Sequence, residues 1–301
     1  MTVLEAIQKS ADFLAKKGVE SPRLQTELLL AHLLKLPRMK LYLNFERTLT
    51  AAEVDALREL VRRRGQREPL QHLTGTVSFC GSEIAVNRHA LVPRPETELL
   101  AEYGWNFLVT RHSSPVTALD FGTGTGCIAI ALAVKCPTAK ITATDVSPDA
   151  LAVAKENAAR NRVAERIEFL PGDGFAALNS MWEGRRVGDA NSGTAARHPS
   201  QFDLIISNPP YIPSAEIPTL QPEVRDFDPR SALDGGADGL NFYHLFASQA
   251  AAFLKPGGKI MLEFGDGQAE AVRQIFENEK WIVEAVREDY SQRARILIAR
   301  R

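Results

Sequence analysis

The sequence VTALDFGTGTG, residues 116–126, joins an apolar strand pattern to a glycine-rich turn, and an apolar helix pattern follows at residues 126–135. The glycines allow a sharp turn and let a ligand approach the backbone closely. In nucleotide-binding α/β proteins, such a ligand lies over the turn and the helix N-terminus. The spacing is G-x-G-x-G rather than G-x-G-x-x-G, which weakens the dinucleotide interpretation. A tight turn that only packs helix on strand remains the alternative.

Downstream of this turn, strand and helix patterns alternate to the end of the chain, which predicts an α/β fold with a doubly wound sheet. The last two strand patterns are joined by a short link, which favours a closing antiparallel pair over a parallel return. Helices are predicted at 126–135, 148–160, 240–254 and 267–278. Strands are predicted at Val116–Phe121, Ile141–Thr144, Ile167–Leu170, Phe202–Ser207, Ile260–Phe264, Trp281–Val286 and Ile296–Ala299.

Upstream of the turn, the sequence changes character twice. Residues 1–72 have helical periodicity, with Ser21 before Pro22 as an expected N-cap and Thr50-x-x-Glu53 as an expected capping box, and they predict a small helical bundle for partner docking. Residues 73–92 alternate like a β-hairpin linker, and 93–301 form the α/β domain. The polar stretch 179–200 predicts a long surface loop.

Composition narrows the classes of function. The chain has 301 residues, enough for two domains, and its formal net charge of −1 gives no global attraction to nucleic acid or acidic membranes. The three cysteines and six histidines have no metal-ligand spacing. We therefore expect free thiols in a reducing compartment and no bound metal.

The N-terminal segment has charged residues at Glu5, Lys9 and Asp12 and does not match a secretory signal. No segment approaches the roughly 20 apolar residues that a membrane helix needs. We expect a cytoplasmic protein without membrane association, acting as a monomer.

Asp145 strengthens the interpretation of the glycine-rich turn as a nucleotide site. It ends the second strand pattern of the α/β region, where an acidic residue accepts hydrogen bonds from ribose hydroxyls. The alternative is a turn or N-cap aspartate ahead of Ser147-Pro148. Turn and acid together indicate an adenosine-containing cofactor.

The segment Gly172-Asp173-Gly174-Phe175 follows the third strand pattern, where the fold borders the base of a bound nucleotide. Asp173 is placed to accept from an adenine amino group, and Phe175 is placed to pack nearby. A plain turn is the alternative.

Asn208-Pro209-Pro210-Tyr211 follows the fourth strand pattern, beside the crevice at the strand C-termini. The prolines cannot continue a ladder and fix a rigid bend that exposes carbonyl oxygens. Asn208 adds a side-chain acceptor and donor. Such a cluster can hold a planar amino group by its two hydrogens, whereas a proline-rich loop with a buried tyrosine is the alternative.

With these motifs in hand, the chain resembles the class I S-adenosylmethionine-dependent methyltransferases that act on planar amino groups. More narrowly, it is similar to the release factor glutamine methyltransferase family (PrmC/HemK). The resemblance spans nearly the whole chain, including the N-terminal helical region. It is carried by Pro93–Glu98, Phe121–Gly126, Asp145–Ala150, Ser207–Ile212 and Leu233–Leu240.

The resemblance implies a Rossmann-like domain with a seven-stranded mixed sheet, its last strand antiparallel, that uses S-adenosylmethionine. The implied reaction is N5-methylation of the glutamine in the GGQ motif of class I peptide chain release factors. Asn208, Pro209, Pro210 and Tyr211 would be the catalytic and substrate-binding residues. The residues implied for the cofactor are Gly122, Thr123, Gly124, Thr125, Gly126, Asp145, Asp173, Gly174, Phe175 and Asn208. Pro93–Glu98 would lie near the methionine end of the cofactor.

The chain departs from the family pattern at three places. Phe121 stands where leucine is frequent, and Gly174 stands where some relatives carry a bulky aromatic, which puts base stacking at 174 in question. The stretch 179–200 is longer than the family pattern leads us to expect.

An arginine cluster lies in the helical region, at Arg58, Arg62, Arg63, Arg64 and Arg67. A solvated helix face is one interpretation. The other is a docking patch for a release factor or nearby ribosomal RNA.

Two other functions compete with glutamine methylation. An N6-adenine methyltransferase acting on DNA or RNA would also hold a planar amine, but it must grip a phosphate backbone and usually flips its base. A binding protein that has lost catalysis is the second, since fold alone never proves activity.

Overall fold

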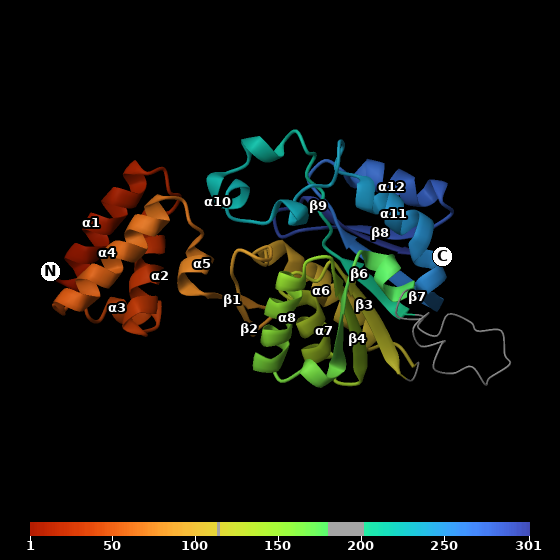
Figure 1. Ribbon diagram of the computed structural model, residues 1–301, viewed down its shortest axis with the longest axis horizontal. Helices are drawn as coiled ribbons and strands as arrows, with labels where there is room; N and C mark the ends of the chain where they lie inside the picture. Colours follow the sequence, from red (N-terminus) through yellow and green to blue (C-terminus); the bar gives the residue numbers. More distant parts are fainter. Residues whose placement is uncertain (113–114, 180–201) are drawn as a thin grey trace. The chain divides into compact units, whose positions relative to one another are not determined.

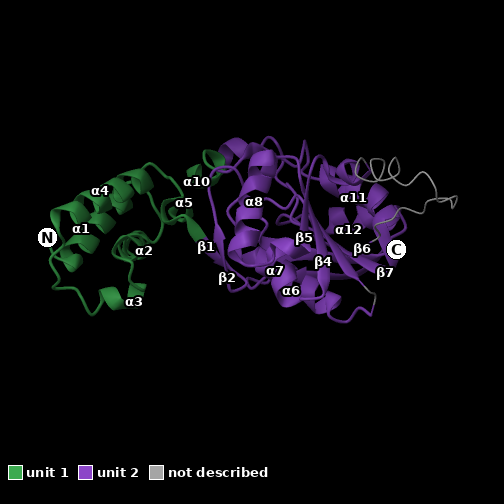
Figure 2. Ribbon diagram, turned by 60° about the horizontal axis from the view of Figure 1, so that its bottom comes forward, with its two compact units in different colours: residues 1–76, 220–227 green, residues 77–219, 228–301 purple. Residues whose placement is uncertain are grey.

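The computed structural model describes residues 1–112, 115–179 and 202–301. These residues group into two compact units, coloured separately in Figure 2. The first contains residues 1–76 and 220–227, and the second contains residues 77–219 and 228–301. The predicted surface loop at 179–200 lies outside the described residues except for Asn179.

The first unit is helical, and Figure 1 shows its residues 1–76 in red and orange and its helix α10 in teal. Thr50 and Glu53 form the predicted capping box. Ser21 differs from expectation, because its left-handed backbone, φ 47°, leaves the side chain without a capping bond. The helices are α1 (Val3–Lys16), α2 (Pro22–Leu34), α3 (Arg38–Leu41), α4 (Ala51–Gly65), α5 (Leu70–Thr74) and α10 (Pro222–Arg225).

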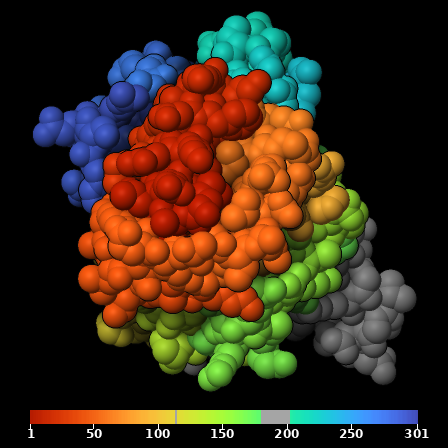
Figure 3. All heavy atoms as spheres, turned by 90° about the vertical axis from the view of Figure 1, so that its left-hand side faces the viewer, coloured from red at the N-terminus to blue at the C-terminus, as the bar shows by residue number. Residues whose placement is uncertain are grey.

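Apolar side chains from α1, α2 and α4 fill the core of this unit, including the fully buried Ile7, Leu14, Leu29 and Leu30. Their burial removes several hundred Å² of apolar surface from water, which is the main stabilising contribution in a bundle of this size. In the space-filling view, the red and orange atoms form one continuous surface (Figure 3).

The arginine cluster is paired with carboxylates of the same unit. Arg58, Arg62 and Arg63 each lie 2.6 Å from a neighbouring carboxylate oxygen, on Asp55, Glu59 and Glu68 respectively. Arg64 and Arg67 reach Glu223 of α10, at 2.7 and 2.6 Å. These partners neutralise much of the positive charge that a docking patch would use.

Glu223 is the acidic residue most enclosed by this cluster. Its side chain is 16% exposed, and that of Arg64 is 4% exposed. Burial raises the pKa of Glu223, but hydrogen bonds from Arg67 and Arg64 outweigh it, and the net shift is downward. Residues 220–227 therefore join the helical unit through the charged hydrogen bonds of Glu223 with Arg64 and Arg67.

Replacing Glu223 with alanine is expected to lower the unfolding free energy by about 2 kcal/mol, because it leaves the buried Arg64 guanidinium without its carboxylate. Glu59→Ala removes an exposed pair and is the control, with an expected cost within about 0.5 kcal/mol. Urea denaturation followed by circular dichroism measures both. Equal costs would show that the Glu223 pair behaves as a surface salt bridge.

The second unit contains a seven-stranded mixed sheet in the order β5-β4-β3-β6-β7-β9-β8. Neighbouring strands from β5 to β7 are parallel, and β9 runs antiparallel to both β7 and β8, as the resemblance implies. The strands are β3 (Val116–Phe121), β4 (Ala139–Asp145), β5 (Ile167–Pro171), β6 (Phe202–Ser207), β7 (Leu254–Glu263), β8 (Ile282–Glu288) and β9 (Ala294–Arg300).

Helices cover both faces of the sheet (Figure 1). On one face lie α6 (Pro95–Leu108), α7 (Cys127–Lys135) and α8 (Pro148–Arg160). On the other lie α11 (Asn241–Gln249) and α12 (Ala269–Asn278). β3 and β6 are almost entirely buried because they lie in the middle of the sheet with helices on either side.

The predicted helix at 240–254 is helical from Asn241 to Phe253, but only its first part is an α-helix. It divides into α11 and a 3-10 turn, η4 (Ala250–Phe253), and β7 begins at Leu254, before Pro256-Gly257-Gly258. The other 3-10 turns are η1 (Ala164–Arg166), η2 (Ile217–Thr219) and η3 (Arg230–Ala232).

The predicted hairpin is present as β1 (Thr76–Phe79) and β2 (Ser82–Ala85). The buried Asn157 of α8 anchors it. Its Oδ1 accepts from the Ala85 amide at 2.7 Å, and its Nδ2 donates to the carbonyls of Ala85 and Thr125, both at 3.0 Å. One side chain thus joins hairpin, helix and glycine-rich turn.

A membrane span was not expected, and no helix in the described ranges is both long and apolar enough to form one.

Candidate active site

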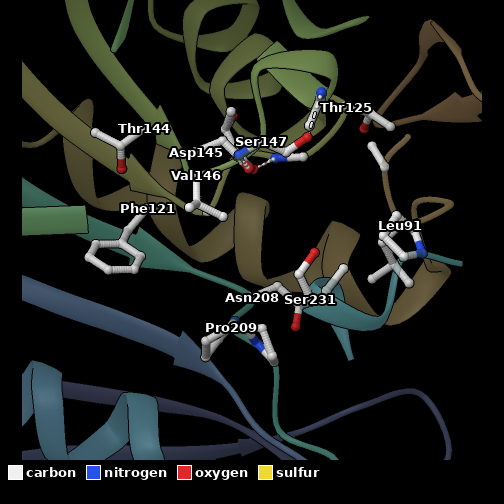
Figure 4. A pocket seen from close by; sticks show the side chains of 18 of the residues that line it. Leu91, Phe121, Thr125, Thr144, Asp145, Val146, Ser147, Asn208, Pro209 and Ser231 are labelled. Atoms are coloured by element: carbon white, nitrogen blue, oxygen red, sulfur yellow. Dashed lines mark hydrogen bonds between the residues drawn. The ribbon is translucent and has the colours of Figure 1, made fainter. Parts of the chain in front are cut away.

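A cavity of about 260 Å³ lies in the second unit, at the C-terminal ends of the parallel strands. The turns after β3, β4, β5 and β6 all contribute to its wall, and so does the segment 89–97. In Figure 4, Asp145 and Val146 lie on one side of this cavity, and Asn208 and Pro209 lie on the opposite side. The crevice rule for open α/β sheets predicts a ligand at this edge.

The glycine-rich turn is held open by backbone hydrogen bonds. The amides of Gly122 and Thr123 both donate to the Thr144 carbonyl at 2.9 Å. Gly122 has φ +71°, and a Cβ built there meets nothing within 4 Å. Gly126 has φ +81°, and its Cβ would lie 3.0 Å from the Ala154 Cβ, so this glycine allows α7 and α8 to pack.

Asp120 fixes the turn from beneath. It is fully buried, and its Oδ2 accepts from the Thr123 hydroxyl at 2.6 Å and from the Ala129 amide at 3.0 Å. Burial raises the pKa of this carboxyl to about 7, although these two hydrogen bonds oppose the rise. Asp120 therefore supports the ligand-facing backbone without lining the cavity itself.

Asp145 lines the cavity and also organises its own turn. Its Oδ2 accepts from the Gly124 amide, and its Oδ1 accepts from the Ser147 amide, both at 2.8 Å. Ser147 in turn caps α8 through the Ala150 amide. The turn role considered from sequence is present, but each carboxylate oxygen can accept a second hydrogen bond, so a ribose hydroxyl can still bind.

In the segment Gly172-Asp173-Gly174-Phe175, the aromatic residue does not lie where the sequence predicted it, beside the base of a bound nucleotide. Asp173 is exposed and lines the cavity together with Gly174, whereas Phe175 is 2% exposed and packs in the core. Its ring stacks on Phe253 at a centroid distance of 4.7 Å. The turn after β5 points Phe175 inward because the apolar core between sheet and α11 takes up its ring.

Phe121 takes the place at the cavity that Phe175 was expected to have. Its ring lines the cavity, and a Cβ built on Gly174 would lie 2.0 Å from the Phe121 Cζ. The two departures from the family pattern are therefore coupled. The phenylalanine occupies space beside a residue that has no side chain, and it supplies the apolar wall there.

Substituting Gly174 with alanine is expected to lower the unfolding free energy by about 2–3 kcal/mol, because the residue has φ +47° and its new methyl group would overlap Phe121. Gly267→Ala is the matched control. It has φ +78° but open space around it, so it is expected to cost about 1 kcal/mol. Urea denaturation compares the two, and equal costs would contradict the Phe121 overlap.

The Asn208–Tyr211 segment is held rigidly at the end of β6. The Ser207 hydroxyl donates to the Phe121 carbonyl at 2.6 Å, and Asn208 Nδ2 donates to Thr97 Oγ1 at 3.0 Å. Asn208, Pro209 and Pro210 line the cavity. The Tyr211 carbonyl accepts from Gln268 Nε2 at 2.9 Å.

The Tyr211 ring does not line the cavity, although the resemblance implies a substrate-binding role for this residue. It packs with the core cluster near Gly265 instead, and burial raises the pKa of its hydroxyl to about 12. Figure 4 correspondingly shows Asn208 and Pro209, rather than the tyrosine, among the labelled side chains of the site.

The segment Pro93–Glu98 contributes Pro93, Arg94 and Thr97 to the cavity wall. Arg94 Nη2 lies 3.0 Å from Oδ2 of the buried Asp228. Burial raises the pKa of Asp228 to about 6, with Arg94 opposing that rise. The ion pair between Arg94 and Asp228 thus stabilises this wall of the cavity.

Ten of the site residues expected from sequence meet at this cavity, and Gly126, Phe175 and Tyr211 do not line it. The sequence interpretation did not assign a role in the site to several lining residues, including His89, Leu91, Val146, Ser231 and Phe242. Val146 and Ser147 follow Asp145 directly, so their adjacency was a usable signal. Phe242 and Ser231 carried no such signal.

No group of three potential metal ligands occurs among the residues with described positions. The cysteines are free thiols. Cys127 lines the cavity, but burial raises the pKa of its thiol well above the usual range, so it does not act as a nucleophile.

An adenosine-containing sulfonium cofactor matches these residues. The open Gly122 backbone allows close approach, Asp145 accepts from hydroxyls, and Phe121 offers an apolar wall. The hydroxyls of Thr125 and Thr144 are buried and have no hydrogen-bond partner within the described part of the chain. The pocket therefore combines apolar walls with convergent polar groups, as ligand sites do.

Comparison with known proteins gives matches in both units. The family model for the PrmC N-terminal domain matches residues 5–75, and a methyltransferase domain model matches residues 112–295. The fold is also shared with the hMettl16 catalytic domain solved in complex with the MAT2A 3'UTR hairpin 6. That similarity has a TM-score of 0.50 and 14% identity, and it covers 72% of this chain and 75% of that one. The chain is a methyltransferase.

Curated relatives define the class more narrowly. The release factor glutamine methyltransferase of Geobacter sulfurreducens is 43% identical over 275 residues, covering 91% of this chain and 88% of that protein. The protein of the same name from Chlorobaculum tepidum is 42% identical over 273 residues, covering 89% and 87%. The chain belongs to the release factor glutamine methyltransferase family.

Proposed function

We propose that this chain transfers the methyl group of S-adenosylmethionine to the N5 atom of the GGQ glutamine in class I peptide chain release factors. The observation that carries the proposal is the meeting of two motifs in one cavity. Asn208 and Pro209 lie across from the glycine-rich turn and Asp145 (Figure 4). Family membership supports the choice of glutamine as the acceptor.

The cofactor would be held by residues at the ends of β3, β4 and β5. Gly122 and Gly124 present backbone, Asp145 accepts from the ribose, and Asp173 accepts from the adenine amino group. Phe121 packs against the apolar part of the nucleoside. The bound cofactor supplies an electrophilic methyl group.

The acceptor amide is a poor nucleophile because its nitrogen lone pair is delocalised into the carbonyl. The site therefore has to hold the nitrogen in line with the methyl group, roughly 3 to 3.5 Å away. Asn208 Oδ1 and the Pro209 carbonyl would accept its two N–H groups. These fixed acceptors also stabilise the positive charge that develops on nitrogen during transfer.

Proton loss follows methyl transfer, because an N-alkylated amide cation is strongly acidic, and water takes the proton. His89 lines the cavity, but its Nδ1 lies 3.5 Å from Asp149 and the side chain is 47% exposed. We assign it no step in the reaction.

The proposal takes the enzyme to be a monomer. Its substrates act on ribosomes, so the proposal places the protein in the cytoplasm. A direct contact with ribosomal RNA is not needed for the reaction, and the paired state of the arginine cluster gives it little support.

The test is incubation with methyl-labelled S-adenosylmethionine and purified release factors, followed by mass spectrometry of the GGQ peptide. Label on the glutamine supports the proposal. Label on adenine in a DNA or RNA substrate, with none on the factors, would support the N6-adenine methyltransferase. Cofactor binding without transfer to any of these substrates would support a binding protein.

A further inference from the structure

Beneath Asn208 lies a buried polar pair that the reaction itself does not use. Thr97 is 3% exposed and belongs to the first turn of α6, whereas Glu263 is 2% exposed and ends β7. Thr97 and Glu263 are far apart in the sequence, but both lie beside the side-chain amide of Asn208. Buried polar groups of this kind are costly unless they are paired, so their placement calls for a function.

Asn208 Nδ2 donates to Thr97 Oγ1 at 3.0 Å. Since this oxygen accepts from Asn208, the Thr97 hydroxyl proton is left to donate elsewhere. Thr97 and Asn208 both lower the pKa of the Glu263 carboxyl, and its buried Oε2 accepts no hydrogen bond from the residues that the structure describes, so this oxygen is free to accept one.

The orientation of an asparagine amide is decided by the groups around its two ends. A carboxylate only accepts, and Thr97 Oγ1 accepts from Asn208 in the structure. Both favour the nitrogen of Asn208 on their side. The Oδ1 atom is then left to face the cavity, where an acceptor for the substrate N–H is required.

We propose that Thr97 and Glu263 are positioning residues that hold the Asn208 amide with its oxygen toward the acceptor nitrogen. The inference rests on the proposed function, and it adds two residues that set the orientation of the Asn208 side chain. Neither residue makes or breaks a bond in the reaction. They affect methyl transfer only by fixing the orientation of the Asn208 amide.

The surroundings of Glu263 support a role that depends on ionisation. Burial raises the pKa of its carboxyl to about 7, and Thr97, Arg295 and Asn208 oppose that rise while Glu96 adds to it. Tyr211 and Tyr243 also face the group, and the Tyr243 hydroxyl donates to the Glu263 carbonyl at 2.9 Å. Protonation turns one carboxyl oxygen into a donor, which favours the opposite orientation of the amide.

The first experiment is a double-mutant cycle on methyl transfer to a release factor. Thr97→Val keeps the shape of the side chain and removes the hydroxyl, and it is expected to lower kcat about tenfold with little change in cofactor affinity. In an Asn208→Ala background, the same substitution is expected to change the residual kcat by less than about twofold. Equal losses in the two backgrounds would overturn the proposal.

The matched control is Thr97→Ser, which keeps the hydroxyl and removes a methyl group. It is expected to retain kcat within about threefold of wild type, because the hydrogen bond survives. A serine variant as slow as the valine variant would trace the effect to packing and overturn the proposal. This variant also serves if Thr97→Val does not fold.

The pH profile provides a readout that packing alone would not change. Wild-type kcat is expected to rise between pH 6 and pH 8 as Glu263 ionises, since the carboxylate favours the productive amide. Glu263→Gln cannot ionise and is expected to lose that rise. Asp120 titrates in the same range and is present in both proteins, so the ratio of the two profiles isolates Glu263. Identical profiles would overturn the role of Glu263.

A measurement without substrate separates this inference from the proposed function. Hydrogen exchange of the Asn208 side-chain amide protons, followed by NMR, is expected to be slow in wild type and at least about tenfold faster in Thr97→Val. Unchanged exchange would overturn the network. A wild-type protein that modifies no release factor but keeps this protection would overturn the proposed function alone.

Discussion

Replacing Asn208 with alanine is expected to lower kcat for release factor methylation about 10²- to 10³-fold, because one fixed acceptor aimed at the developing charge is lost. Cofactor affinity is expected to stay within about twofold, since the glycine-rich turn and Asp145 remain intact on the other wall of the cavity. Single-turnover kinetics measures the chemical step, and isothermal titration calorimetry measures cofactor binding.

Asn278→Ala is a suitable control for Asn208→Ala, because this asparagine is exposed at the end of α12 and away from the cavity. Its kcat should match wild type. An Asn208→Ala protein with unchanged turnover would rule out the assigned acceptor. A protein that had lost cofactor affinity and turnover together would place Asn208 in cofactor binding instead.

Replacing Asp145 with alanine is expected to weaken cofactor binding about 100-fold, equivalent to roughly 2–3 kcal/mol for charge-assisted hydrogen bonds. Two losses combine in this variant. The ribose loses its acceptor, and the amides of Gly124 and Ser147 lose the carboxylate that orders the turn. Titration calorimetry with S-adenosylhomocysteine measures the change directly.

Asp149→Ala controls for the loss of an acidic side chain close by in the chain. Asp149 is 71% exposed and contacts His89 rather than the cavity, so its removal should leave cofactor affinity nearly unchanged. An Asp145→Ala protein that binds the cofactor as tightly as wild type would assign Asp145 to turn structure alone.

The sequence predicted β3 and β6 well because they carry short, mainly apolar runs bounded by turn residues, which is the pattern of buried parallel strands. The Thr50–Glu53 capping box was also predicted correctly, because both residues lie within one short stretch of sequence. The expected cap at Ser21 was wrong, because a Ser-Pro pattern does not encode the left-handed backbone that this residue adopts.

The site was predicted in part for the same reason. Residues within motifs at strand ends, such as Asp145 and Asn208, reach the cavity because the parallel strands end together. The orientation of an aromatic ring depends on the apolar core around it. The rings of Phe175 and Tyr211 pack with the core cluster and therefore do not line the cavity. The approach of Phe121 to Gly174, and of Thr97 to Asn208, joins segments whose proximity no local pattern encodes.

The attachment of residues 220–227 to the helical unit has a consequence for dissecting this enzyme. The polypeptide leaves the Asn208–Tyr211 segment, enters the other unit through Glu223, and then returns to Asp228, the partner of Arg94. A truncated protein that starts after residue 76 would keep residues 220–227 without the helical unit to which they belong. The helical unit is thus formed from two separate stretches of the chain, so chimaeras that exchange the N-terminal bundle between relatives should exchange residues 220–227 with it.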